Sequence, residues 1–155
     1  MTIRFANMED IPQLLNLLRQ VEGVHHAIRP DLFRDGGEKY EPETLKELLG
    51  DVDRPVLAAE EDGVVVGYAF CMLEKTVGDP ARLDRRELYL DDLCVDASVR
   101  GKGVAKLLWQ RTVELARELG CDAVTLNVWE GNDRARKFYE NCGLSVRKTF
   151  MEYPL

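Results

Sequence analysis

The segment from Leu88 to Leu119 constrains the fold of this chain more than any other part of its sequence. Its first eight residues have the apolar content of a strand, and a short stretch with two glycines follows. An amphipathic stretch comes next, in which apolar side chains repeat at the 3.6-residue period of a helix: Val104, Leu107, Leu108, Leu115 and Leu119. The segment therefore predicts a strand, a tight loop and a core-facing helix in direct succession.

The start of that helix is predicted to bind an anion. The first N–H groups of a helix have no partner inside it, and the aligned peptide dipoles add about half a positive charge there. Gly101 and Gly103 allow a positive φ and a close backbone approach, while Arg100 and Lys102 add full charges, so a pyrophosphate suits this loop. Two commoner glycine motifs are excluded, because Lys106 replaces the third glycine of G-x-G-x-x-G and no P-loop sequence occurs.

Two segments of the chain match known motifs. Arg100-Gly-Lys-Gly-Val-Ala105 fits R/Q-x-x-G-x-G/A, and the segment from Asn132 to Leu144 fits N-x-x-A-x-x-F-Y-x-x-x-G-F, with Leu144 in place of the usual Phe. The first resembles the acyl-CoA pyrophosphate motif of the GNAT acetyltransferase superfamily, and the second resembles another motif of that superfamily. The resemblance implies acetyl-CoA as cosubstrate and transfer of its acetyl group to a primary amine by direct attack on the thioester.

The same resemblance implies where the cofactor binds. The glycine loop and the first helical turn would hold the pyrophosphate, and backbone groups of the preceding strand would hold the pantetheine arm, which one asparagine would also touch. The residues implied are Leu93, Cys94, Val95, Arg100, Gly101, Lys102, Gly103, Val104, Ala105 and Asn132. Asn132 has a structural alternative, because Asn is a preferred N-cap for the helix that follows it.

Amine acetylation needs a group that takes a proton from the amine. An alkyl ammonium with a pKa near 10.4 is neutral about once in 2,500 molecules at pH 7, so a positioned carboxylate helps. The candidate carboxylates before the glycine loop are Glu87, Asp91 and Asp92. Side chains alternate along a strand, so Asp91 and Asp92 point to opposite faces unless a β-bulge breaks the alternation.

Asp91 is the favoured base of the two aspartates. It lies nine residues before Arg100, where the resemblance to polyamine acetyltransferases implies a glutamate base. The structural alternative is that these carboxylates are solvated strand-end charges or partners for Arg85 and Arg86.

Tyr139 is the candidate general acid. It shares one helical face with Ala135, Phe138 and Cys142, so periodicity alone predicts a core tyrosine. The resemblance implies instead that the tyrosine of the Phe-Tyr pair protonates the leaving thiolate, and a phenol with a pKa near 10 suits that exchange. Both interpretations stay open on the sequence.

The remaining patterns predict one mixed α/β domain over residues 1–155. Helices are expected at 8–22, from Pro42 onward and at 133–141, and strands at 2–6, 56–60, 64–73, 88–95, 121–129 and 146–153. Asp62-Gly63 predicts a hairpin turn, and the unit 88–128 predicts parallel neighbouring strands. The resemblance implies the GNAT fold, a mixed central sheet of about six to seven strands with helices on both faces.

Composition excludes several classes of function. A net charge of −7 argues against a nucleic-acid partner and mildly favours a cationic small molecule as acceptor. No run of 18 apolar residues and no signal-peptide pattern occur, so we expect no membrane partner and a cytoplasmic location. The four cysteines are widely spaced, and His25 and His26 match no metal-ligand spacing, so no metal is expected.

Other functions remain open at this point. A chain with the same fold that binds acyl-CoA without catalysis would be a sensor or regulatory module, and a helix N-terminus also accepts other phosphorylated ligands. The acceptor cannot be identified, because residues 23–40 and 76–86 carry no motif. The resemblance also implies a homodimer, for which Trp129 or the C-terminal strand would supply a surface.

Overall fold

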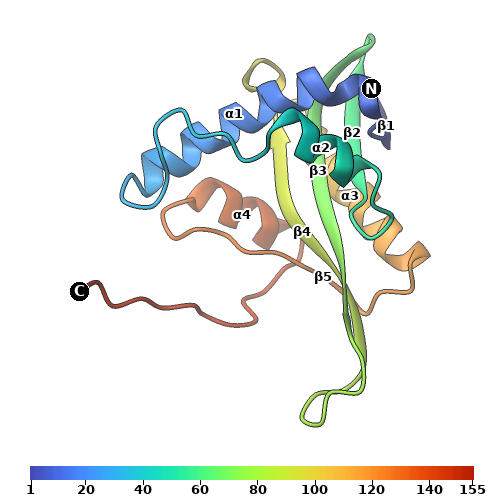
Figure 1. The fold of residues 1–155 in the computed structure, drawn as a ribbon, viewed down its shortest axis with the longest axis vertical. Helices are drawn as coiled ribbons and strands as arrows, with labels where there is room; N and C mark the ends of the chain where they lie inside the picture. The colour runs from blue at the N-terminus through green and yellow to red at the C-terminus, as the bar shows by residue number, and fades with distance from the viewer.

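The computed structural model describes residues 1–155, and its centre is a mixed sheet of five strands (Figure 1). In order across the sheet, the strands are β1 (Thr2–Phe5), β2 (Val56–Glu61), β3 (Val64–Thr76), β4 (Arg85–Val95) and β5 (Ala123–Thr125). Strands β1 to β4 pair antiparallel, while β5 runs parallel to β4. A parallel pair needs a crossover, which the helix after β4 supplies, as the sequence predicts.

Helices cover both faces of the sheet, as expected (Figure 1). They are η1 (Met8–Asp10), α1 (Ile11–Ile28), α2 (Pro42–Leu49), η2 (Ala97–Val99), α3 (Val104–Glu118) and α4 (Asp133–Asn141), the two η elements being short 3-10 helices. Leucines of α1 and α2 pack with Tyr68 and Phe70 in an α1-side cluster. Leu108 of α3 packs with Leu88 and Leu90 in an α3-side cluster. None of the helices is long and apolar enough to cross a membrane.

The first helix extends beyond its predicted end at residue 22. A capping box fixes the start of this helical segment. The Asn7 side chain accepts the Glu9 N–H, and the Asp10 side chain accepts the Asn7 N–H. The helix continues through Gly23, because one glycine inside a helix costs only about 1 kcal/mol. It ends at Ile28, since Pro30 disfavours a helical conformation for Arg29, whose φ is −134°.

The hairpin between β2 and β3 is confirmed. Asp62 and Gly63 have φ values of 52° and 79°, as the predicted Asp-Gly turn requires. Beyond the predicted strand ends, β3 and β4 stay paired as far as Thr76 and Arg85. The polar loop expected at 76–86 is therefore shorter than predicted.

The expected count of six to seven strands is wrong, because the sheet has five. Residues 146–153 form no strand, and Figure 1 shows the chain after α4 as an extended arm that leaves the sheet. The strand expected at 121–129 is reduced to Ala123–Thr125. A strand requires a hydrogen-bonded neighbour, and only these three residues pair with β4.

Candidate active site

A β-bulge in β4 lies at the centre of the candidate site. In the pairing of β3 with β4, Phe70 lies opposite Asp92 and Cys71 lies opposite Leu90. Asp91 is therefore an extra residue without a partner in the register. Such an extra residue breaks the alternation of side chains along a strand. The bulge therefore allows the Asp91 and Asp92 side chains to face the same site.

The bulge lets Asp91 and Asp92 share one cation. Leu90 and Leu93, on either side of the pair, both pack against the α3-side cluster, and the two carboxylates lie on the opposite, α1 side. Lys39, from the loop between α1 and α2, places its Nζ 2.9 Å from Asp91 Oδ2 and 3.6 Å from Asp92 Oδ2. Two consecutive strand residues thus form one anionic site.

Two tyrosines complete what we call the carboxylate cluster. The Tyr40 hydroxyl donates to Asp91 Oδ2 at 3.4 Å, and the Tyr68 hydroxyl donates to Asp92 Oδ2 at 3.0 Å. The members of the cluster are Lys39, Tyr40, Tyr68, Asp91 and Asp92. Sequence reasoning missed three of them. The loop that carries Lys39 and Tyr40 has no motif, and Tyr68 lies in an apolar run typical of a core strand.

Of the three candidate carboxylates, Glu87 pairs with a nearby arginine, whereas Asp91 and Asp92 do not. Arg85 Nε lies 2.7 Å from Glu87 Oε1, and Arg86 donates to the Leu119 carbonyl oxygen. Glu87 also binds Arg147 at 2.7 Å. Glu87 is therefore occupied by arginines at the far end of β4, whereas the aspartates face Lys39.

Burial and charge together set the proton affinities in the cluster. Asp92 is only 8% exposed, and burial raises the pKa of its carboxyl, against the opposing effects of the Lys39 ammonium and the Tyr68 hydroxyl. Burial lowers the pKa of Lys39, but the two carboxylates outweigh burial and raise that pKa above its usual value. A charged lysine thus stands beside a carboxyl with increased proton affinity.

Tyr139 packs on the α3 side of the sheet. Its ring centroid lies 5.9 Å from that of Trp109 and 5.1 Å from that of Phe138, both edge-on, so the predicted apolar face is confirmed. Its hydroxyl makes no hydrogen bond. Burial, and secondly the negative charge of Asp92, raises the pKa of this phenol. Tyr139 is therefore protonated at neutral pH and has a proton to donate.

Strands β4 and β5 separate after a short paired stretch. Their pairing ends at Tyr89 and Thr125, while β4 continues to Val95. Beyond Tyr89, backbone groups of β4 that face away from β3 have no neighbouring strand. An unpaired strand edge can hydrogen-bond an extended ligand. This opening coincides with the residues to which the resemblance assigns pantetheine.

The side chains at this opening belong to the core. Leu93 and Val95 pack against the α3-side cluster. The buried Cys94 thiol donates to the Leu17 carbonyl oxygen at 3.5 Å, and burial raises its pKa to about 12. Cys94 is buried, while Leu93 and Val95 are half-buried, so the backbone of this segment is the part that faces the opening without a protein partner.

The glycine loop has the expected conformation. Gly101 and Gly103 both have φ of 83°, a left-handed conformation that favours glycine. A Cβ on either residue would meet no atom within 4 Å, so the backbone faces open space. Gly103 is the N-cap of α3 and offers no side-chain cap, which leaves the N–H groups from Val104 onward unpaired in the first turn. The Val104 side chain itself is buried.

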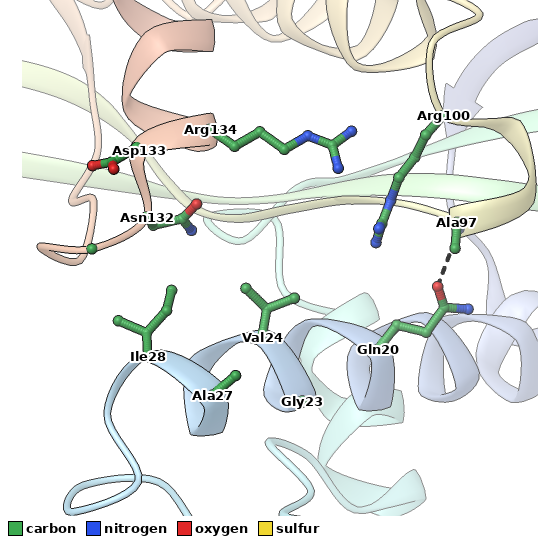
Figure 2. Close-up of a pocket in the computed structure, with 11 residues that line it drawn as sticks. Gln20, Gly23, Val24, Ala27, Ile28, Ala97, Arg100, Asn132, Asp133 and Arg134 are labelled. Atoms are coloured by element: carbon green, nitrogen blue, oxygen red, sulfur yellow. Dashed lines mark hydrogen bonds between the residues drawn. The ribbon is translucent and has the colours of Figure 1, made fainter.

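A cleft of about 680 Å³ opens beside this loop (Figure 2). It lies between α1, the segment before α3, and the start of α4. Its lining residues are Gln20, Gly23, Val24, Ala27, Ile28, Ala97, Arg100, Gly131, Asn132, Asp133 and Arg134. Figure 2 shows Arg100 and Arg134 extending into it from the loop and from α4. Two guanidinium groups beside a free helix N-terminus suit a pyrophosphate.

The cleft also contains residues that sequence reasoning had not selected. Arg134 stands at an unspecified position of the second motif, so no pattern singled it out. Gln20 ties α1 to the loop, because its side chain accepts the Ala97 N–H at 3.3 Å and donates to Asp96 Oδ2 at 2.9 Å. Asn132 caps α4 by accepting the N–H of Ala135 at 3.2 Å, so its structural interpretation is confirmed.

His25 and His26 contact other groups and are not part of a metal cluster. His25 Nδ1 lies 3.6 Å from Glu22 Oε1, and His26 Nδ1 contacts the Phe33 carbonyl oxygen at 2.8 Å. No group of three or more His, Cys, Asp or Glu side chains is arranged to hold a metal ion. All four cysteines are free thiols.

Comparison with protein families decides which family this chain represents. The model described as the acetyltransferase (GNAT) family matches residues 21–144, a range that contains the carboxylate cluster, the glycine loop and Tyr139. The chain belongs to the GNAT acetyltransferase family. The resemblance of the two motifs to this family is therefore confirmed.

Similar proteins agree with GNAT membership. An uncharacterized N-acetyltransferase of Mycobacterium tuberculosis is 32% identical over 103 residues, which cover 66% of this chain and 60% of the relative. The match thus spans about 60% of the length of that curated relative. A mutant of the BH1408 protein from Bacillus halodurans superposes with a TM-score of 0.95 at 30% identity, over 100% of this chain and 99% of that chain. An aminoglycoside N-acetyltransferase in complex with CoA superposes at 0.74 with 19% identity, over 99% and 98%, and shares the fold.

Proposed function

We propose that this chain is an acetyl-CoA-dependent N-acetyltransferase that acts on a primary amine by direct attack on the thioester. The observation that carries the proposal is the bulge at Asp91. It places two carboxylates on one face of β4, just beyond the point where β4 and β5 separate. The Mycobacterium tuberculosis relative is named an N-acetyltransferase, which supports the same activity.

The cleft beside α3 fits the phosphate groups of acetyl-CoA. Arg100 and Arg134 would neutralise the pyrophosphate, and the N–H groups of the first turn of α3 would donate to its oxygens. Gly101 and Gly103 keep that approach open, since nothing occupies the space that their missing Cβ atoms leave. The unpaired edge of β4 would hold the pantetheine arm, whose thioester supplies the acetyl group.

Asp91 is our proposed proton acceptor for the amine. Its side chain is 27% exposed, compared with 6% for that of Asp92, so an acceptor can reach it. Asp92 is the second candidate, and its fixed contacts to Tyr68 and Lys39 suit it to shape the site. As the new N–C bond forms and the C–S bond breaks, the amine proton passes to the carboxylate and the Tyr139 phenol protonates the thiolate.

The acceptor that we propose is a cationic primary amine. Lys39 is itself a primary ammonium, and the carboxylate cluster already binds it at 2.9 Å, with its Nζ 5.7 Å from the centre of the Tyr40 ring. A site that binds the Lys39 ammonium through a carboxylate and an aromatic ring is also suited to the ammonium group of an acceptor. The net charge of −7 supports attraction of a cationic small molecule rather than nucleic acid. We also propose a cytoplasmic homodimer with no membrane partner.

The decisive experiment compares the wild-type chain with Tyr139→Phe. Calorimetric titration measures acetyl-CoA binding, and thiol release measures turnover with a panel of aliphatic diamines and polyamines. We expect equal binding and a turnover roughly 10²- to 10⁴-fold lower in the variant. Binding without turnover for any amine would instead favour an acyl-CoA sensor, and no binding by the wild type would refute the proposal.

A further inference from the structure

Lys39 differs from the other lysines of the chain in its surroundings. The chain has seven lysines, and all of them except Lys39 are exposed. The Lys39 side chain is only 25% exposed, and its Nζ lies 2.9 Å from Asp91 Oδ2 and 3.6 Å from Asp92 Oδ2. A half-buried primary amine of the protein itself therefore contacts the proposed proton acceptor.

The other lysine ion pairs lie at the surface. Lys46 Nζ lies 2.7 Å from Glu43 Oε1, one turn away on the same helix, and Lys75 Nζ lies 3.1 Å from Asp53 Oδ1. Each of these four side chains is at least 43% exposed. Lys75 lies near the end of β3 opposite to the glycine loop. It therefore has the same lysine–aspartate contact as Lys39 without the surroundings of the carboxylate cluster.

The segment that carries Lys39 is attached to the rest of the protein through its side chains. No backbone hydrogen bond involves Glu38, Lys39 or Tyr40. Glu38 pairs with Arg19 at 2.8 Å at the surface, and the Tyr40 hydroxyl contacts Asp91 at 3.4 Å. Segments with few backbone hydrogen bonds open locally at low cost, and exposed ion pairs add little to their stability. This segment can therefore shift without breaking a helix or a strand.

The Lys39 amine lies at the position where the proposed reaction needs its acceptor nitrogen. Asp91 and Asp92 follow Tyr89, at which the pairing of β4 with β5 ends, so they lie beside the opening that would hold the pantetheine arm. The negative charge of Asp92 also contributes to the raised pKa of Tyr139, so these two groups interact across the sheet. The proton acceptor, an amine and the proposed proton donor thus gather around one opening.

We propose that this chain acetylates its own Lys39 with acetyl-CoA as donor, which requires the acetyltransferase activity proposed above. The N–C bond forms between Lys39 Nζ and the acetyl carbon as the C–S bond breaks. One proton of the ammonium passes to Asp91, and a second proton replaces the one that Tyr139 gives to the departing thiolate. The products are an N-acetyl lysine, the CoA thiol and one proton, which Asp91 releases to water.

Acetylation of Lys39 frees the carboxylate cluster. An acetylated lysine has no charge and forms no ion pair. Asp91 and Asp92 then become available to the ammonium of a diffusible amine. Because the two carboxylates stabilise the Lys39 ammonium, the self-transfer is slower than later turnover, and it occurs once per chain. The unmodified chain therefore has an occupied acceptor site and becomes more active as Lys39 is acetylated.

The first test follows transfer of ¹³C-labelled acetyl groups from acetyl-CoA to the purified full chain by peptide mass spectrometry. The wild type is compared with Tyr139→Phe, in which the Lys39 contacts remain, and Lys75 reports uncatalysed transfer within each sample. We expect acetylation of wild-type Lys39 at least about tenfold faster than that of Lys75, and loss of this difference in Tyr139→Phe. An acetyl group already on Lys39 of the purified wild type, and absent from the variant, counts as the same result.

Two outcomes of this test overturn the proposal. One is acetylation of Lys39 that is no faster than that of Lys75, and the other is an equal rate at Lys39 in Tyr139→Phe. Turnover of a diffusible diamine, measured in the same samples, separates self-acetylation from the proposed function. Diamine turnover without acetylation of Lys39 overturns self-acetylation alone, whereas absence of both overturns both. Acetylation of Lys39 without turnover of any amine supports self-acetylation and counts against the proposed acceptor.

A second test decides whether the transfer stays within one chain. A ¹⁵N-labelled Tyr139→Phe chain is mixed with unlabelled wild type and acetyl-CoA. We expect rapid acetylation of Lys39 in the unlabelled chain only, at a rate that does not depend on protein concentration. Equal acetylation of Lys39 in both chains would mean transfer between molecules and would overturn self-acetylation.

A third test measures the effect of the modification on the acceptor site. Wild type and Lys39→Met are each incubated with acetyl-CoA before steady-state kinetics with a cationic amine. We expect the incubation to lower the KM of the wild type several-fold, toward that of Lys39→Met, and to leave the variant unchanged. An unchanged KM in fully acetylated wild type overturns the release of the carboxylate cluster.

Discussion

Asp91 and Asp92 are consecutive in β4, yet both carboxylates contact the ammonium of Lys39, at 2.9 and 3.6 Å. In a regular strand, neighbouring side chains point to opposite faces, and one of the two would face α3. The bulge removes that separation and concentrates two negative charges at the opening between β4 and β5. The chemistry that we propose follows from this local departure from strand geometry.

The proposed roles of the two aspartates can be separated by substitution. We expect Asp91→Asn to lower kcat/KM roughly 10²- to 10⁴-fold, because an amide cannot take the amine proton. Asp92→Asn should cost less, about tenfold, because it alters the surroundings of the acceptor. Steady-state kinetics with a cationic amine gives both values, with Asp53→Asn, whose carboxylate pairs with Lys75 at the surface, as the control. Full activity in Asp91→Asn would contradict the assignment.

Lys39→Met should change the pH dependence of activity. The Lys39 ammonium opposes the burial effect that raises the pKa of Asp92, so its loss raises that pKa further. Since the cluster works with charged carboxylates, the acidic limb of kcat/KM against pH should move to higher pH. The KM for a cationic amine should fall several-fold, because the acceptor no longer competes with Lys39. Lys46→Met, at an exposed lysine of α2, should shift neither quantity, and an unchanged acidic limb in Lys39→Met would count against this coupling.

Arg134→Ala should weaken acetyl-CoA binding by about tenfold, or roughly 1.4 kcal/mol, because a charge-assisted contact to phosphate is lost. Arg117→Ala removes an equal charge from the exposed end of α3, away from the cleft, and serves as the matched control. Calorimetric titration at constant ionic strength distinguishes the two. Equal affinities for the two variants would mean that net charge, rather than the cleft, sets the binding.

Asp10→Asn should destabilise the protein at neutral pH. Arg4 donates two hydrogen bonds to Asp10, at 2.7 and 2.8 Å, and these chiefly lower the pKa of a carboxyl that is 4% exposed. Because Arg4 is partly exposed, we expect a loss of about 2 kcal/mol, below the range for a fully buried pair, and a Tm lower by roughly 4–8 °C.

The pH dependence of that loss has a definite sign. A carboxyl whose folded pKa is depressed contributes stability above its unfolded pKa, near 3.9, and loses it as the pH falls through the lower folded value. The Tm difference between Asp10→Asn and the wild type should therefore be full at pH 7 and shrink below about pH 4. Glu9→Gln, an exposed neighbour, should show almost no difference. A gap that is constant with pH would exclude the ion pair as its cause.

Local patterns predicted the elements whose stability is local. The Asp62-Gly63 turn, the glycine conformations before α3 and the amphipathic face of α4 all depend on residues a few positions apart. Predictions failed where an element depends on a distant neighbour. The segment 146–153 has a strand pattern but pairs with no strand, and only Ala123–Thr125 of the strand expected at 121–129 pairs with β4.

Residue type and short spacing were enough to predict the GNAT motifs, most of the strands and helices, and Asp91, Asp92, Tyr139 and Arg100 as candidate residues. These features depend on residue type and short spacing, which backbone sterics and side-chain periodicity translate directly. The folded sheet was needed to show that the two aspartates share a face, because a bulge exists only relative to the register of β3. It also brought in Lys39, 52 residues before Asp91, because contacts between distant segments are set by packing and not by local spacing.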